Sequence, residues 1–126
     1  MPLPLDPQQT IYQQIAQLIE DGILSGAMPE DSAVPSINQL ARLYQINPAT
    51  ALKGVTLLAD ERLIYKRRGL GMFIAPGARE RLKSKRRAAF EREYVAPLMR
   101  EGSRLDMGTD EILGLITKHK EETDHE

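Results

Sequence analysis

Two short helices joined by a very tight connection are the feature of this sequence that most restricts its fold. Ser36-Ile37-Asn38-Gln39 has the capping-box pattern of a helix start, and the apolar spacing that follows predicts a helix over about 37–44. Asn47 and Pro48 are a favoured N-cap and a favoured first helical residue, so a second helix is expected over about 48–60. Helices joined so closely cross at a steep angle, as in a helix-turn-helix.

The flanking segments extend this pattern on both sides. Upstream, apolar residues at helical spacing predict a helix over about 11–24. Downstream, residues 63–68 and 72–75 have the composition of two strands, and Gly69-Leu70-Gly71 supplies the turn between them. Three helices followed by a β-hairpin predict a winged helix-turn-helix domain over residues 1–76.

The remainder, residues 77–126, is predicted to be a helical tail, which makes the fold class mainly α with a small β-hairpin. A helix is expected from Arg79 to Met99, with Pro97 kinking or ending it, and a last helix from Thr109 to about Lys120. The apolar faces of these helices are too large to pack only on so small a domain, so we expect them to meet their copies in a homodimer. The expected dimerisation residues are Leu82, Phe90, Tyr94, Leu98, Ile112, Leu113, Leu115 and Ile116.

Charge is segregated along the chain although the net charge is only −1. Residues 62–92 hold eleven bases against two acids, whereas residues 1–61 and 106–126 are each net acidic. Local sign decides where a polyanion can dock, so the middle of the chain is the expected contact with DNA. For the basic run 79–87, two interpretations remain open: a solvated helix face, or a surface that flanks DNA or lines a ligand site between subunits.

Several other classes of protein are not indicated. The chain has no cysteine, no apolar run of membrane-spanning length and no signal-peptide pattern at its start, so a cytoplasmic protein is expected. The two histidines, His119 and His125, lie in the acidic end and are not expected to bind metal. No side chains stand in a recognisable catalytic context, so neither an enzyme nor a cofactor is predicted.

A series of motifs over roughly residues 10–75 resembles the DNA-binding domain of the GntR family of bacterial regulators, in particular its short YtrA-type subfamily. The motifs are Ile11-Tyr12-Gln13-Gln14-Ile15, Gly22-Ile23-Leu24-Ser25-Gly26, Val34 to Ala41, Ile46-Asn47-Pro48-Ala49-Thr50, Leu58 to Ile64 and Arg67 to Ile74. The resemblance implies that the helix over 48–60 enters the major groove and that the hairpin tip approaches the minor groove.

The resemblance and the chemistry of the side chains together indicate a set of DNA-binding residues. Amide, hydroxyl and basic groups reach base edges and phosphates, and a small residue permits close approach. The candidates are Ser36, Asn38, Asn47, Pro48, Ala49, Thr50, Lys53, Arg67, Arg68 and Gly69. Asn38 stands where the family usually has Arg and Leu52 where it usually has a polar residue, so we expect weaker affinity or a different readout there. Capping alone is the alternative role for Asn47 and Thr50, and edge protection the alternative for Arg67 to Gly69.

The predicted function is sequence-specific binding to a near-palindromic DNA operator by a homodimer, with repression as the default outcome implied by the resemblance. Two alternatives come from other classes. The winged helix is instead a protein-interaction module, or the dimer senses a small effector in the cleft between its subunits.

Overall fold

The computed structural model describes residues 10–124, which divide into two compact units with the boundary between Lys85 and Arg86. The first unit ends nine residues later than the predicted limit at residue 76, because the start of the helix that follows the hairpin packs into its core. Each unit is considered by itself. Within residues 10–124, no helix is long and apolar enough to cross a membrane.

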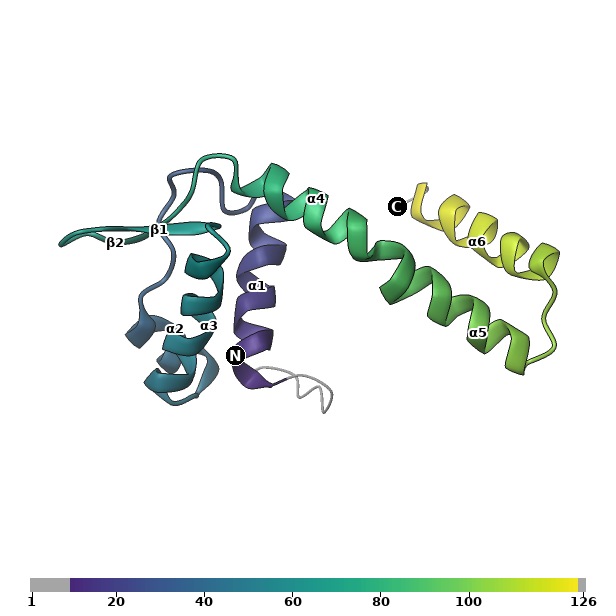
Figure 1. Ribbon diagram of the computed structural model, residues 1–126, viewed down its shortest axis with the longest axis horizontal. Helices are drawn as coiled ribbons and strands as arrows, with labels where there is room; N and C mark the ends of the chain where they lie inside the picture. Colours follow the sequence, from purple (N-terminus) through teal and green to yellow (C-terminus); the bar gives the residue numbers. More distant parts are fainter. Residues whose placement is uncertain (1–9, 125–126) are drawn as a thin grey trace. The chain divides into compact units, whose positions relative to one another are not determined.

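The first unit is a three-helix arrangement with a projecting hairpin (Figure 1). Its elements are α1 (Ile11–Ser25), α2 (Ile37–Tyr44), α3 (Pro48–Asp60), β1 (Ile64–Arg67), β2 (Gly71–Ile74) and the first part of α4 (Ala78–Phe90). Helix α3 packs against both α1 and α2, and the strands pair antiparallel with Ile64 opposite Ile74. This is the winged helix-turn-helix predicted from the sequence, with helix bounds within a residue of those expected.

Local caps explain why the tight turn forms. Ser36 and Gln39 close a complete capping box at the start of α2. At its end Gln45 adopts a left-handed conformation with φ 56°, and the Ile46 N–H donates to the Ala41 carbonyl at 3.0 Å. Asn47 then caps α3. One left-handed residue therefore changes the direction of the chain, and α3 begins three residues later.

The core of the first unit is apolar and draws on every element. Its fully buried large side chains are Ile15, Ile23, Leu58, Leu63, Ile74 and Leu82. Gly54 lies where α3 crosses α1, and a Cβ built there would be 2.8 Å from the Tyr12 carbonyl oxygen. Helix α3, which is the candidate recognition helix for the major groove, is therefore held against α1 at a distance that only glycine permits.

The loop before α2 joins the hairpin as an additional extended segment, which the sequence did not indicate. The Asp31 N–H donates to the Ile74 carbonyl at 2.8 Å, the Ile74 N–H to the Ser32 carbonyl at 2.9 Å, and the Val34 N–H to the Met72 carbonyl at 2.8 Å. These bonds cover the edge of β2 that faces away from β1, so β2 is hydrogen-bonded on both of its edges.

The second unit continues α4 into a π-helical turn, η1 (Glu91–Val95), then α5 (Ala96–Arg104) and α6 (Thr109–Asp124). The predicted end of this helix near Met99, which was attributed to Pro97, was wrong, because the helix continues to Arg104. Proline has no N–H to donate, and the preceding Ala96 N–H reaches back to the Glu91 carbonyl in the π pattern. A wider turn before the proline thus accommodates it inside a continuous helix.

Two of the expected dimerisation residues are instead buried within the chain. Leu82 is fully buried in the core of the first unit, because α4 begins on that core. Ile112 is 4% exposed and packs on Gly102, whose missing side chain makes room for it between α5 and α6. Both predictions were wrong for one reason: helical spacing marks an apolar face but does not say what covers it.

Candidate nucleic-acid interface

The first turn of α3 presents side chains rather than free backbone groups. The Asn47 Oδ1 accepts from the Ala49 N–H at 2.8 Å, and the N–H groups of Thr50 and Ala51 donate to the Asn47 carbonyl. Pro48 has no N–H. Residues 48–51 therefore hold no unpaired backbone donor for a phosphate, contrary to the general expectation for a helix start. The amide NH₂ group of Asn47 remains available to donate to a base edge.

Lys53 lies one turn further along the same helix and is held by an aromatic ring. Its Nζ is 5.0 Å from the centroid of the Tyr12 ring, which belongs to α1. The side chain is exposed, so the ammonium group is restrained without being buried. Of the remaining predicted residues on α3, Pro48 and Ala49 are exposed and Thr50 is half-buried.

Helix α2 begins with two exposed polar residues from the predicted set. The Ser36 Oγ accepts from the Gln39 N–H at 3.1 Å, and the hydroxyl hydrogen stays free to donate. Asn38 is exposed and follows Ile37 in the first turn, where backbone N–H groups have no acceptor within the helix. Gln39 was missing from the predicted set: its Oε1 accepts from the Ser36 N–H at 2.8 Å, which leaves its NH₂ group available.

The tip of the hairpin is formed by Arg68, Gly69 and Leu70. The Leu70 N–H donates to the Arg67 carbonyl at 2.9 Å, and Gly69 has φ 78°, which favours glycine. Among the described residues, Arg68 has no hydrogen-bond or ion-pair partner, and Leu70 is 73% exposed. These two side chains are the ones that the turn offers to solvent.

Arg67 does not extend from the tip as the sequence suggested. Its guanidinium carbon lies 4.3 Å from the centroid of the Phe73 ring and 5.3 Å from that of Tyr65. One of its nitrogens donates to the Tyr65 hydroxyl and lies 3.5 Å from the Asp31 carboxylate. We call these four residues, Asp31, Tyr65, Arg67 and Phe73, the wing clamp. No sequence signal placed Asp31 near the hairpin, because the contact spans two distant segments.

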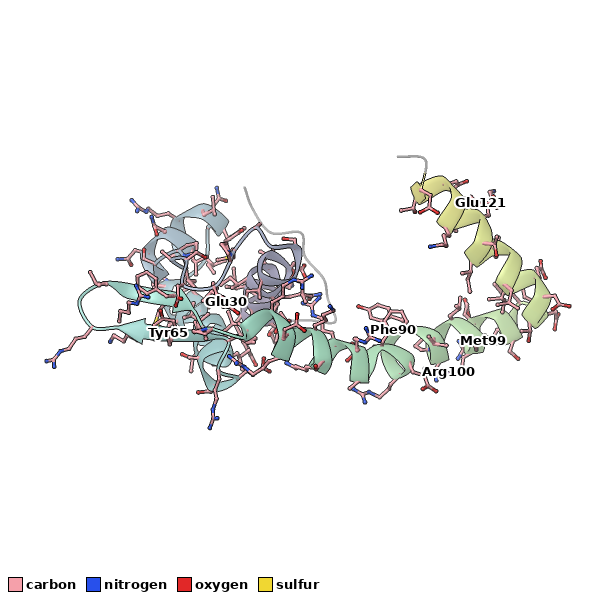
Figure 2. All side chains as sticks on the ribbon, turned by 90° about the horizontal axis from the view of Figure 1, so that it is seen from above. Glu30, Tyr65, Phe90, Met99, Arg100 and Glu121 are labelled. Carbon is pink, nitrogen blue, oxygen red and sulfur yellow. The ribbon has the colours of Figure 1, made fainter. Side chains whose placement is uncertain are left out.

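Tyr65 lies at the centre of the wing clamp and is labelled on the hairpin in Figure 2. Its hydroxyl donates to the Asp31 Oδ1 at 2.6 Å. That hydrogen bond, with a smaller contribution from burial, raises the pKa of Tyr65 above its usual 10.0, while the Arg67 guanidinium acts in the opposite direction. The neutral phenol is therefore the form that the folded wing favours.

The basic run 79–87 serves largely to fasten α4 to the first unit. Arg79 donates to the Leu24 carbonyl at 3.0 Å, and Arg81 donates to the carbonyls of Pro76 and Arg62. Lys85 forms an ion pair with Glu61. Three of the six bases in this run are thus paired with carbonyl groups and a carboxylate of the same unit.

The second unit carries an apolar groove and no grouped metal ligands. The groove lies between α5 and α6, and its lining includes Leu98, Leu105, Met107, Leu115, Ile116 and His119. His119 lies 3.8 Å from the Glu122 carboxylate. Residues 10–124 contain no group of three metal-ligating side chains, and His125 lies outside the described residues.

A three-helix unit with an exposed first turn on its third helix, followed by a β-hairpin, defines a winged helix-turn-helix of the DNA-binding class. The model of the gntR family of bacterial regulatory proteins matches residues 11–74. The chain belongs to this family, whose members are regulators and not enzymes.

Relatives and solved structures agree with this assignment. The chain is 33% identical over 82 residues to the HTH-type transcriptional repressor YtrA of Bacillus subtilis, covering 64% of this chain and 63% of that protein. A GntR-family transcriptional regulator from Bacteroides thetaiotaomicron is 31% identical with a TM-score of 0.71, covering 90% of this chain and 99% of that one. The AraR DNA-binding domain in complex with operator ORX1 is 26% identical with a TM-score of 0.52, covering 60% of this chain and 92% of that one. The chain spans less than two thirds of the length of the curated relatives it matches.

Proposed function

We propose that this chain is a transcriptional repressor that binds a near-palindromic DNA operator as a homodimer in the cytoplasm. The carrying observation is the exposed first turn of α3, where the Asn47 amide and Thr50 precede Lys53 on the helix that the fold offers to a major groove. The names of the relatives support repression, and the AraR complex supports docking of this domain on an operator.

Each predicted contact has a distinct expected role. Asn47 and Thr50 contact base edges, with Pro48 and Ala49 permitting close approach of the backbone. Lys53 contacts phosphate from its position beside Tyr12, and Ser36 and Asn38 contact the backbone from the first turn of α2. Arg68 and Gly69 bring the wing tip to the minor groove.

The second unit supports the proposal of a homodimer. Its exposed large apolar side chains include six of the eight predicted dimerisation residues. Phe90 and Tyr94 pack their rings on each other 5.5 Å apart, and Phe90 and Met99 project from the helical stretch in Figure 2. An apolar surface of this extent is unusual on a monomer. The residues that remain candidates are Phe90, Tyr94, Leu98, Leu113, Leu115 and Ile116.

Sequencing of the genomic DNA fragments that the purified protein retains tests the function. A dimer predicts an inverted repeat whose half-sites lie about one helical turn apart. Thr50→Ala is expected to change the sequence preference, whereas Lys53→Ala is expected to weaken binding about equally on all sequences. Absence of any enriched repeat with folded protein at low salt would contradict the proposal.

Salt dependence separates DNA binding from the alternative of a protein-interaction module. A dimer that neutralises several phosphates loses affinity steeply between about 50 and 200 mM salt. A module that docks a protein through a small interface has no such requirement. Binding to DNA that is weak and nearly independent of salt would favour the alternative.

Light scattering tests the dimer. Leu115→Asp places a carboxylate in the apolar groove and is expected to give monomers. Thr117→Asp is the matched control, since Thr117 is exposed on the same helix and outside the groove. If Leu115→Asp remains a dimer, as Thr117→Asp is expected to, this surface is not the interface.

A further inference from the structure

The two arginines of the wing occupy different environments although they are neighbours in the sequence. Arg67 is stacked on Phe73 and bonded to the Tyr65 hydroxyl, and its side chain is 42% exposed. Arg68 has no partner among the described residues and lies in the turn itself. The positive charge of Arg67 is therefore held in the wing clamp, whereas that of Arg68 is available to a ligand.

The tip has a second side chain that nothing in the fold explains. Leu70 is 73% exposed and lies between Gly69 and Gly71, both with positive φ. A Cβ at either glycine would meet no atom within 4 Å, so these glycines are not required by packing. The tip therefore presents one guanidinium and one apolar side chain, separated by bare backbone.

We propose that Arg68 and Leu70 are the wing residues that enter the minor groove of DNA, and that Arg67 is a positioning residue that holds the wing through the clamp. This inference rests on the proposed function and deepens it. It divides between two residues a role that the sequence assigned to Arg67, Arg68 and Gly69 together.

The chemistry of the minor groove fits the two tip side chains. A narrow groove concentrates negative potential and favours a guanidinium, which is desolvated more easily than an ammonium. Proteins that enter this groove also insert apolar side chains such as leucine beside or between base steps. Glycines at 69 and 71 leave the backbone without side chains that would hinder its approach to the sugars.

The chemistry of the clamp explains why Arg67 is not available for the same task. Its guanidinium neutralises Asp31, whose carboxylate is 53% exposed on the loop beside the hairpin. If Arg67 left to contact DNA, it would lose the stacking on Phe73 and leave that carboxylate uncompensated near the phosphates. A lysine would keep the charge but not the planar stacking on the Phe73 ring.

Hydrogen exchange in the free protein tests the positioning role without any DNA. Arg67→Ala and Arg67→Lys are both expected to speed exchange of the Val34 amide, which bonds to β2, by about tenfold or more. Arg68→Ala is expected to leave this amide at the wild-type rate. Unchanged protection in both Arg67 variants would overturn the positioning role.

Affinity measured against salt tests the contact role on an operator from the selected pool. Arg68→Ala is expected to lower affinity about tenfold and to reduce the salt slope by about 0.9 per subunit. Leu70→Ala is expected to lower affinity several-fold with an unchanged slope, because no charge is lost. Arg104→Ala, which removes an exposed arginine of the second unit, is the control and should match wild type.

Substituted base pairs identify the groove that is contacted. Inosine–cytosine pairs keep the minor-groove edge of A·T, whereas G·C pairs add an amino group there. When A·T pairs opposite the wing are replaced, the wild-type protein should keep its affinity for inosine–cytosine pairs and lose affinity for G·C pairs. Arg68→Ala should bind both substituted sites equally well.

The outcomes separate this inference from the proposed function. A salt slope that falls in Arg67→Ala, is restored in Arg67→Lys and is unchanged in Arg68→Ala would reverse the assignment and overturn it. If the wild-type protein selects no DNA at all, the proposed function and the contact role both fail. The positioning role is decided in either case by the exchange rates of the free protein.

Discussion

Gly54→Ala is the substitution that most directly tests how the structure positions the recognition-helix candidate. Glycine inside a helix is less favourable than alanine by about 1 kcal/mol, so the substitution alone would stabilise α3. In the structure, however, the new Cβ would lie 2.8 Å from the Tyr12 carbonyl oxygen and 3.0 Å from the Ile15 Cγ2. The first of these is a backbone atom and cannot move unless the two helices separate.

The magnitude follows from these two opposing effects. Overpacking a well-packed core costs about 1–3 kcal/mol, and a collision with backbone belongs at the upper end of that range. Subtracting the propensity gain leaves a net destabilisation of about 2 kcal/mol, or about 8–16 °C in Tm for a unit of this size. Separation of α3 from α1 also displaces Lys53 from the Tyr12 ring, so DNA affinity is expected to fall as well.

Urea unfolding followed by circular dichroism measures the effect, at one fixed protein concentration because association would shift the midpoint. Gly22→Ala is the matched control within the same unit. Its Cβ would meet the Met28 Sδ at 2.8 Å and the Cγ at 3.0 Å, but both atoms belong to a flexible side chain that can move. We expect Gly22→Ala to lie within about 0.5 kcal/mol of wild type. If Gly54→Ala proves as stable as the control, the close crossing of α1 and α3 does not exist in solution.

Three further predictions concern the core, the helix cap and the wing. Leu82→Ala should destabilise the first unit by about 2–5 kcal/mol, and Leu98→Ala by much less when measured on the monomer, because only Leu82 is fully buried within the chain; equal losses in urea unfolding would argue against this. Asn47→Asp should keep the cap and the stability of α3 but abolish DNA binding, because the NH₂ donors are replaced by a negative charge; DNA binding at wild-type affinity would show that Asn47 only caps. The pKa of Tyr65, isolated as the absorbance difference from Tyr65→Phe, should lie above 10.0 and fall in Asp31→Ala. Because the folded state favours the phenol, this contribution to stability is present below pH 10 and is lost as the pH rises through the folded pKa; a midpoint unaffected by Asp31→Ala would refute the cause.

Local chemistry in the sequence was enough to predict the three helices and the hairpin of the first unit, and with them the class of protein. Ser36 with Gln39, and Asn47 with Pro48, fix helix starts through bonds within a few residues, so a pattern of residue types suffices to find them. Asn47 with Pro48 located the first turn of α3 in the same way, and Gly69-Leu70-Gly71 located the turn of the hairpin.

Tertiary structure alone decided how those elements use their side chains. The sequence gives the apolar spacing of Leu82 and Ile112 but not which surface covers them, and both prove to be internal. It likewise shows Arg67 and Arg68 as one basic pair, whereas folding brings Asp31 beside the hairpin and commits only the first of them. The physical reason is that caps and turns depend on bonds between near neighbours, while burial and ion pairing depend on segments that only the folded chain brings together.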